Sequence, residues 1–329
     1  MRLRHEPERS PRSTHAQQTS FEHAMQSVEL RNTRCALCGT EGNAAELYPA
    51  NFDLEALNPA VFSARRLPDR VHYRLVKCNA CGLVRSDPVA PPELLTQLYH
   101  QSTFTYTDEV ADLKRTYGRY LARLDRYGAR KDALLEIGCG NGFFLQQAQA
   151  QGYRSVRGVE PSRAAVSQAA PEVRDSIVCD LMRPGLFGPA EFDVICLFQV
   201  FDHVPDPGTL LDACFTALRP GGLVLSLNHN VTAVSARLLG ERSPIIDIEH
   251  TYLYSPATMR RIFAAHGFRI RKAGSVRNQY SLRYLFRLLP LPAGPKRAML
   301  DWLQRHSIGR VRFWVPLGNL HLVAQKPGI

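Results

Sequence analysis

The sequence lacks any long apolar run. No window reaches the roughly 18 uncharged apolar residues that a membrane-spanning helix requires. Residues 1–20 contain no apolar segment typical of a secretory signal, so we expect a disordered tail over residues 1–33 and a cytoplasmic protein. Because the cytosol is reducing, the eight cysteines are not expected to form disulfides.

The last quarter of the chain has almost no acid. From Pro256 onward it holds fourteen Lys or Arg and a single acidic residue, Asp301, while the whole chain has a formal net charge of +11. We expect this segment to meet something anionic, such as a nucleotide, a phosphorylated carrier, nucleic acid or an acidic membrane face. A solvated basic surface that keeps the protein soluble is the alternative.

Four cysteines form two CxxCG motifs, and they are Cys35, Cys38, Cys78 and Cys81. Two such pairs fit a tetrahedral zinc site, and the following glycines free backbone N–H groups to donate to the sulfur atoms. A site with four thiolates has no open position for catalysis. We therefore predict a small zinc-ribbon-like module over residues 34–92, with a structural Zn²⁺.

A glycine-rich turn at residues 134–145, LLEIGCGNGFFL, organises the second half. A short apolar run predicts a buried strand, and Gly138, Gly140 and Gly142 allow a tight turn close to a ligand before a helix begins. Glu136 precedes the turn, and the spacing is GxGxG rather than the GxGxxG of dinucleotide sites. An acidic residue here suits a cationic ligand.

Strands and helices alternate from residue 131 onward, which predicts an α/β, Rossmann-like, doubly wound sheet of seven strands. A helical linker over residues 93–130 precedes it. The second strand ends at Glu160, whose carboxylate can accept both hydroxyls of a ribose. The third strand is followed by Asp180. Residues 311–327 are expected to supply an antiparallel seventh strand with a hairpin-like turn at Gly318 and Asn319.

These motifs, in this order, resemble the class I S-adenosylmethionine-dependent methyltransferases over residues 131–326. The resemblance implies that S-adenosylmethionine is the cofactor, with an acidic residue after the third strand holding the adenine. The cofactor-binding residues are then Glu136, Gly138, Gly140, Gly142, Glu160, Asp180, Leu181 and Gln199. In look-alike enzymes aromatic residues near Tyr99 and Tyr106 cover the cofactor, although both tyrosines could equally belong to the core.

The N-terminal half and the segment FDHVPDP resemble zinc-bearing methyltransferases of sugar and polysaccharide pathways. That resemblance implies a catalytic pair, Asp202 and His203. An imidazole with a pKa near about 6.5 suits removal of a proton near neutral pH. His203 could instead only shape the pocket, and His229 and His250 are further candidates for the base.

Two stretches are additions to a minimal catalytic fold. Residues 232–250 form a long connection of the kind that is usually functional. Residues 278–309 predict two helices joined by a Pro-Gly turn, with Arg283 and Arg287 four positions apart. This second stretch could be a substrate lid, a dimer surface, a basic amphipathic patch on a membrane, or a packed helical pair.

The sequence favours methyl transfer to the oxygen or carbon of a small-molecule acceptor, such as an anionic sugar, a nucleotide sugar or a lipid-linked glycan intermediate. No Asn/Asp-Pro-Pro-aromatic motif follows the fourth strand, so methylation of a nucleobase amino group is not supported. An RNA methyltransferase and a cofactor-binding regulatory protein that docks a partner are the alternatives. The oligomeric state stays open.

Overall fold

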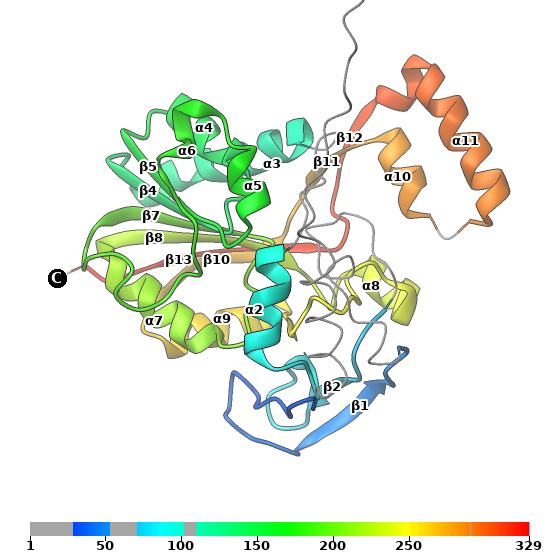
Figure 1. Cartoon of the computed structure of the whole chain (residues 1–329), viewed down its shortest axis with the longest axis horizontal. Coiled ribbons are helices and arrows are strands. Elements are labelled where there is room, and N and C mark those ends of the chain that lie inside the picture. Colours follow the sequence, from blue (N-terminus) through cyan, green and yellow to red (C-terminus); the bar gives the residue numbers. More distant parts are fainter. Residues whose placement is uncertain (1–28, 53–70, 102–109, 290, 329) are drawn as a thin grey trace, which may run out of the picture.

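A seven-stranded sheet forms the centre of the computed structural model, which describes residues 29–52, 71–101, 110–289 and 291–328 (Figure 1). Its strand order is β10-β13-β8-β7-β4-β5-β6, and only β13 runs antiparallel to its neighbours. The strands are β4 (Ala133–Ile137), β5 (Ser155–Val159), β6 (Ile177–Val178), β7 (Phe192–Phe198), β8 (Leu218–His229), β10 (Arg269–Ser275) and β13 (Asn319–Gln325). The predicted fold class is confirmed.

Helices cover both faces of this sheet (Figure 1). One face carries α3 (Val110–Ala122), α4 (Phe143–Ala150), α5 (Arg163–Ser167) and α6 (Pro171–Arg174), and the other carries α7 (Pro207–Ala217) and α9 (Pro256–Ala265). Successive side chains of a strand point to opposite faces. In β7, Cys196 accordingly joins the core under α3 and α4, while Ile195 and Leu197 join the core under α7 and α9.

A smaller antiparallel sheet lies on the N-terminal side, with strand order β1-β2-β3-β9. Three of its strands come from the cysteine-bearing segment: β1 (Ala44–Tyr48), β2 (Leu75–Cys78) and β3 (Val84–Ser86). The fourth, β9 (Tyr252–Leu253), comes from the C-terminal half and pairs with β3. The Ser86 hydroxyl also donates to the carbonyl oxygen of His250 at 2.7 Å. The N-terminal sheet is thus completed by the chain that follows residues 232–250.

The end of the chain supplies the predicted antiparallel strand as β13, but the rest of this segment differs from the prediction. Residues 311–327 split into β12 (Arg312–Val315) and β13, and these two strands do not form a hairpin. β12 pairs with β11 (Asn278–Ser281), whereas β13 lies between β8 and β10. Pro316 has no N–H to donate, and Gly318 turns the chain with a φ of 72°, so pairing cannot continue from one strand into the other.

The predicted helical pair is present as α10 (Leu282–Leu288) and α11 (Ala293–Arg305), although its first four residues are strand β11. A 3-10 turn, Ser307–Arg310, follows α11, and α8 (Val234–Leu239) lies in the other added stretch. α2 (Pro92–Gln101) links the N-terminal sheet to the main sheet. None of the described helices is both long enough and apolar enough to span a bilayer. Residues 1–28 of the predicted tail, and Tyr106, lie outside the described residues.

Candidate active site

A cavity of about 920 Å³ opens at the carboxyl ends of β4, β5, β7 and β8. Open α/β sheets bind ligands at this edge, and a volume near the top of the usual range has room for two ligands side by side. Both added stretches contribute to its wall, residues 232–250 through α8 and the loop after it, and residues 278–309 through α10.

The glycine turn lines the cavity with Gly138 and Gly140, which adopt φ values of 71° and 55°. A Cβ on Gly138 would lie 2.3 Å from Cγ2 of Val200, so a side chain cannot be placed there. Gly142 does not line the cavity. It precedes α4 with a φ of 73°, and a Cβ there would meet Val173 and Ile177. Its role is therefore to let α4 approach its neighbours.

A buried carboxylate, Glu136, and a half-buried one, Glu160, stand beside the turn. Glu160 accepts hydrogen bonds from the N–H of Gly140 at 2.9 Å and of Ser162 at 2.8 Å, one on each oxygen. Each oxygen keeps a second lone pair for a ligand. Burial raises the pKa of both Glu160 and Glu136, and the neighbouring Glu160 raises that of Glu136 further. A cation bound here would offset this repulsion.

The cavity wall also contains polar atoms that need a partner. Among the described residues, neither Glu136 Oε2 nor Gln199 Oε1 has a hydrogen-bond partner, although both are buried. Gln199 holds a φ of 56°, which is uncommon for a residue with a side chain. A ligand that carries positive charge and N–H donors would meet both atoms, as the sulfonium and ammonium groups of S-adenosylmethionine would. Asp180 and Leu181 line the same cavity, so every predicted cofactor residue except Gly142 lies in its wall.

Asp202 lies beneath this wall and is fully buried. One carboxylate oxygen accepts from the Asn228 side chain at 2.9 Å, and the other accepts from Nδ1 of His229 at 2.6 Å. Three surrounding histidines, led by His229, keep the Asp202 pKa well below its usual range, although burial alone would raise it. Asp202 does not line the cavity, so it acts on a ligand only through its neighbours.

His229 and His203 both line the cavity, but they differ in which ring nitrogen is available. Because Nδ1 of His229 donates to Asp202, Nε2 of the neutral ring carries the lone pair. His203 has Nδ1 at 3.2 Å from the Tyr99 hydroxyl and Nε2 at 3.7 Å from Asp202. If Tyr99 donates, the remaining N–H of His203 points toward the carboxylate. Burial lowers the His203 pKa to about 3, which keeps the ring neutral.

His250 completes the cluster. Its Nδ1 donates to the carbonyl oxygen of Ile245 at 2.8 Å, which leaves a lone pair on Nε2, 3.9 Å from Asp202. Burial lowers the His250 pKa. Asp202, His229 and His250 are together a donor set that a divalent metal could use. The short hydrogen bond from His229 to Asp202 already accounts for the arrangement without a metal.

The charge of the wall was not foreseen from the sequence. Asp247 and Glu249 come from residues 232–250 and line the cavity near His250. Among the described lining residues there is no Lys or Arg. No local motif predicts the acidic character of the wall, because the wall is assembled from segments far apart in the chain.

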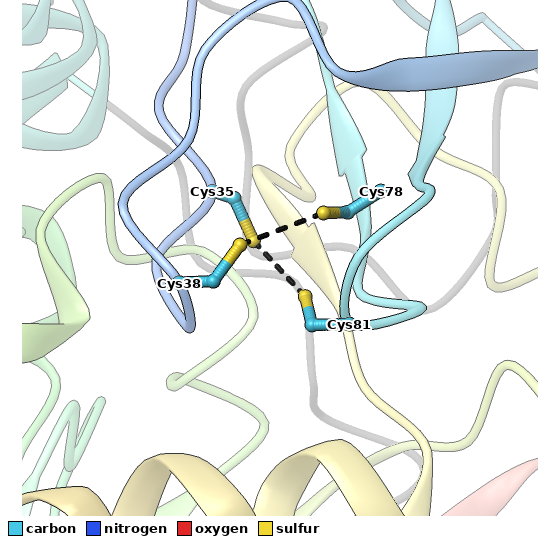
Figure 2. Close-up of side chains that lie close together, drawn as sticks. All are labelled: Cys35, Cys38, Cys78 and Cys81. Carbon is cyan, nitrogen blue, oxygen red and sulfur yellow. Dashed lines mark hydrogen bonds between the residues drawn. The ribbon is translucent and has the colours of Figure 1, made fainter.

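A separate cluster gathers Cys35, Cys38, Cys78 and Cys81, whose sulfur atoms all lie within 4.8 Å of one another (Figure 2). The Sγ atoms of Cys35 and Cys81 are 3.2 Å apart, and those of Cys38 and Cys78 are 3.6 Å apart. Tetrahedral zinc with bonds of about 2.3 Å requires sulfur separations of roughly 3.8 Å. Gly39 and Gly82 follow the two pairs with φ values of 69° and 77°, a left-handed conformation that favours glycine.

Comparison with known proteins finds a family match over a segment that contributes much of the cavity wall. Residues 110–273 match the family described as "Methyltransferase domain". The chain is 32% identical over 117 residues to the ubiquinone biosynthesis O-methyltransferase of Stutzerimonas stutzeri, covering 32% of this chain and 49% of that protein. It is 32% identical over 133 residues to the enzyme of the same name from Caulobacter vibrioides, covering 36% and 52%.

The chain therefore spans about half the length of the curated relatives that it matches. Among solved structures, a "SAM dependent methyltransferase" from Archaeoglobus fulgidus is similar at 18% identity, with a TM-score of 0.43, over 72% of this chain and 100% of that one. The match of residues 110–273 shows that the chain carries a methyltransferase domain.

Proposed function

We propose that this chain, which carries a methyltransferase domain over residues 110–273, transfers a methyl group from S-adenosylmethionine to a hydroxyl of a small amphiphilic acceptor. S-adenosylmethionine supplies an electrophilic methyl group on a positively charged sulfur. Glu160 and Asp180 would hold its nucleoside, and Glu136 and Gln199 its charged amino acid part. This assignment is supported by the two buried oxygens that lack partners within the described residues.

The observation that carries the proposal is the pair Asp202 and His229. The buried carboxylate fixes the tautomer of His229, so that the Nε2 lone pair is available at the cavity. A neutral imidazole oriented in this way can accept a proton from a hydroxyl as that oxygen attacks the methyl carbon. Asp202 then stabilises the imidazolium that forms. We therefore assign the base to His229 and a positioning role to Asp202, and we give His203 the role of packing against Tyr99.

The cavity favours an acceptor whose reacting end is uncharged. The lining combines acids with aromatic and aliphatic side chains, and no Lys or Arg among the described lining residues could neutralise a phosphate. Arg283 and Arg287 instead line a smaller hollow beside it, which shares Leu113, Tyr280 and Tyr284 with the cavity. An anionic group of the acceptor would lie there. An acceptor with an uncharged reacting end and a separate anionic group, such as a lipid-linked glycan precursor, fits the cavity and the hollow together, and so does a hydroxylated ring with an apolar tail. The names of the two relatives favour O-methylation.

We further propose that the four cysteines bind one structural Zn²⁺. Four thiolates satisfy a tetrahedral ion completely, so this site would stabilise the N-terminal sheet without taking part in methyl transfer. The convergence of the four sulfur atoms in Figure 2 supports this assignment.

The test is calorimetry with S-adenosylmethionine, followed by transfer of a labelled methyl group to three kinds of acceptor. These are alkylated hydroxyaryl compounds, a nucleotide sugar and an RNA transcript. We expect binding of the methyl donor and methylation of the alkylated hydroxyaryl compounds. Absence of donor binding would reject the proposal, and methylation of RNA alone would support the RNA alternative.

A further inference from the structure

Residues 278–289 and 291–315 form a lobe, here termed the C-terminal lobe, that contains β11, α10, α11, the following 3-10 turn and β12. Figure 1 shows α10 and α11 projecting from the body of the protein. Leu303 is the buried residue of α11, a helix of 13 residues. A helix that buries so little stabilises no core of its own, so its exposed surface needs another explanation.

The exposed surface of this lobe is unusually apolar. In the part of the chain that the structure describes, twelve large hydrophobic side chains are exposed, and eight of them belong to the lobe. They are Leu289, Leu291, Met299, Trp302, Ile308, Val311, Phe313 and Trp314. Single exposed apolar residues are ordinary, but a concentration of this kind marks an interaction surface.

Basic residues are interleaved with these apolar ones. The lobe contains Arg283, Arg287, Lys296, Arg297, Arg305, Arg310 and Arg312 against one acidic residue, Asp301. Arg312 is paired with Asp112 of α3, but Arg297, Arg305 and Arg310 are exposed. Aromatic and aliphatic side chains mixed with Lys and Arg are typical of surfaces that rest on an anionic bilayer, where apolar groups enter the interface and cations meet lipid headgroups.

We propose that the C-terminal lobe docks on anionic lipid bilayers and brings the mouth of the cavity to the membrane surface. Tyr280, Tyr284, Leu285 and Leu289 of the lobe line the cavity, so the same short segment forms part of the cavity wall and adjoins the exposed surface. An amphiphilic acceptor can then enter without passing through water. This route rests on the proposed function, whereas the docking itself does not.

The far wall of the cavity supports this orientation. Leu238 of α8 lines the cavity and is 80% exposed, and Val234, one turn earlier, is 73% exposed. These two are the most exposed of the twelve apolar side chains. Apolar residues therefore stand on both sides of the cavity, which favours a bilayer at its mouth over a partner that contacts α11 alone.

Tryptophan fluorescence can report whether the lobe docks on a bilayer. Its only two tryptophans, Trp302 and Trp314, both belong to the lobe. Full-length protein is mixed, without a methyl donor, with vesicles of phosphatidylglycerol and phosphatidylcholine or of phosphatidylcholine alone. We expect co-sedimentation with the anionic vesicles, a blue shift of the emission, and quenching by brominated acyl chains. Binding should weaken as salt rises, because the headgroup attraction is screened.

Matched variants distinguish binding through the C-terminal lobe from the effect of losing any exposed arginine or apolar side chain. Arg297→Gln with Arg305→Gln should weaken binding about 25-fold, since each basic residue near an anionic surface contributes about fivefold. Arg126→Gln, an exposed arginine of the 3-10 turn after α3, should change it little. Trp302→Ser should reduce binding, whereas Leu47→Ser, an exposed apolar residue of β1, should not.

Three outcomes would overturn the proposal. The first is equal binding of the wild type and the Arg297→Gln, Arg305→Gln variant to anionic vesicles. The second is burial of the tryptophans in a dimer whose formation abolishes vesicle binding. The third is tight binding of RNA through the same arginines with no binding to vesicles. Failure of methyl transfer would leave the docking result intact, because the vesicle assay requires no turnover.

Discussion

Nδ1 of His229 donates to the buried carboxylate of Asp202 across 2.6 Å, from the last residue of β8 to the loop that follows β7. β7 and β8 are parallel neighbours, so their carboxyl ends meet at one edge of the sheet. The hydrogen bond therefore joins the end of β8 to the loop that follows β7, at the edge of the sheet where both strands end. His229 lines the cavity, and under the proposed function the second nitrogen of its imidazole is the base there.

His229→Gln should strongly lower methyl transfer while leaving donor affinity nearly unchanged, because Glu160 and the glycine turn are untouched. A positioned general base contributes about 10²- to 10⁴-fold, so kcat should fall within that range. His266→Gln, a change at a histidine that pairs with Asp212 on the surface, is the control. Unchanged turnover in His229→Gln, with loss in His203→Gln, would return the base to His203.

Asp202→Asn should lower kcat with a smaller effect on KM, because an amide can present its NH₂ to His229 and reverse the tautomer. The variant also lacks the negative charge beside His229, so the pH profile of kcat should shift. If the variant lost donor binding and folding instead, Asp202 would be shown to act mainly on stability.

Glu160→Gln should weaken the binding of S-adenosylmethionine about 10- to 100-fold, since hydrogen bonds to a charged acceptor contribute about 1.5 to 3 kcal/mol. Calorimetry measures this directly. Glu172→Gln, an exposed glutamate of α6, should bind the donor as the wild type does. Equal affinity of the two variants would exclude Glu160 from the donor site.

Cys38→Ser should release one Zn²⁺ per chain, as measured by elemental analysis, and should lower Tm by at least about 5 °C, because metal binding contributes to folding. Turnover should also fall, since β9 pairs with β3 and lies two residues after His250. Cys179→Ser is the matched control, because Cys38 and Cys179 are the two exposed cysteines among those described. Retention of zinc in Cys38→Ser would contradict the predicted ligand set.

The free energy of unfolding should fall as the pH is lowered from about 6.5. The folded-state pKa of His203 is about 3 because the ring is buried, whereas an unfolded histidine titrates near about 6.5. The unfolded state therefore binds more protons between these values, and stability present above pH 6.5 is lost as the pH falls. His250, whose pKa is also lowered, adds to the same trend.

Urea unfolding at pH 7 and pH 5 should show a loss of about 1 to 2 kcal/mol attributable to His203. His203→Gln should reduce the pH dependence by that amount, while the buried His250, whose ring packs against His203, keeps its own contribution. The same slope in wild type and variant would show that His203 titrates normally in the folded protein.

The sequence by itself determined the features that depend on local patterns. Each of these patterns lies within a short stretch of sequence. They are the buried strands, the glycine turn with its positive φ values and each of the two CxxCG motifs. The position of Glu160 could be predicted in the same way, because it comes directly after the end of a strand. The sequence also indicated where His229 lies. It ends the strand next to the one that precedes Asp202, and the ends of adjacent parallel strands meet at one edge of the sheet.

Only the tertiary structure decided which histidine receives the carboxylate of Asp202, which segment pairs with β3, and where β12 and β13 pair. Each of these depends on contacts between segments that are far apart in the chain, and side-chain periodicity carries no information about which partner is chosen. The acidic wall and the exposed lobe have the same origin, since a surface exists only after distant segments have been brought together.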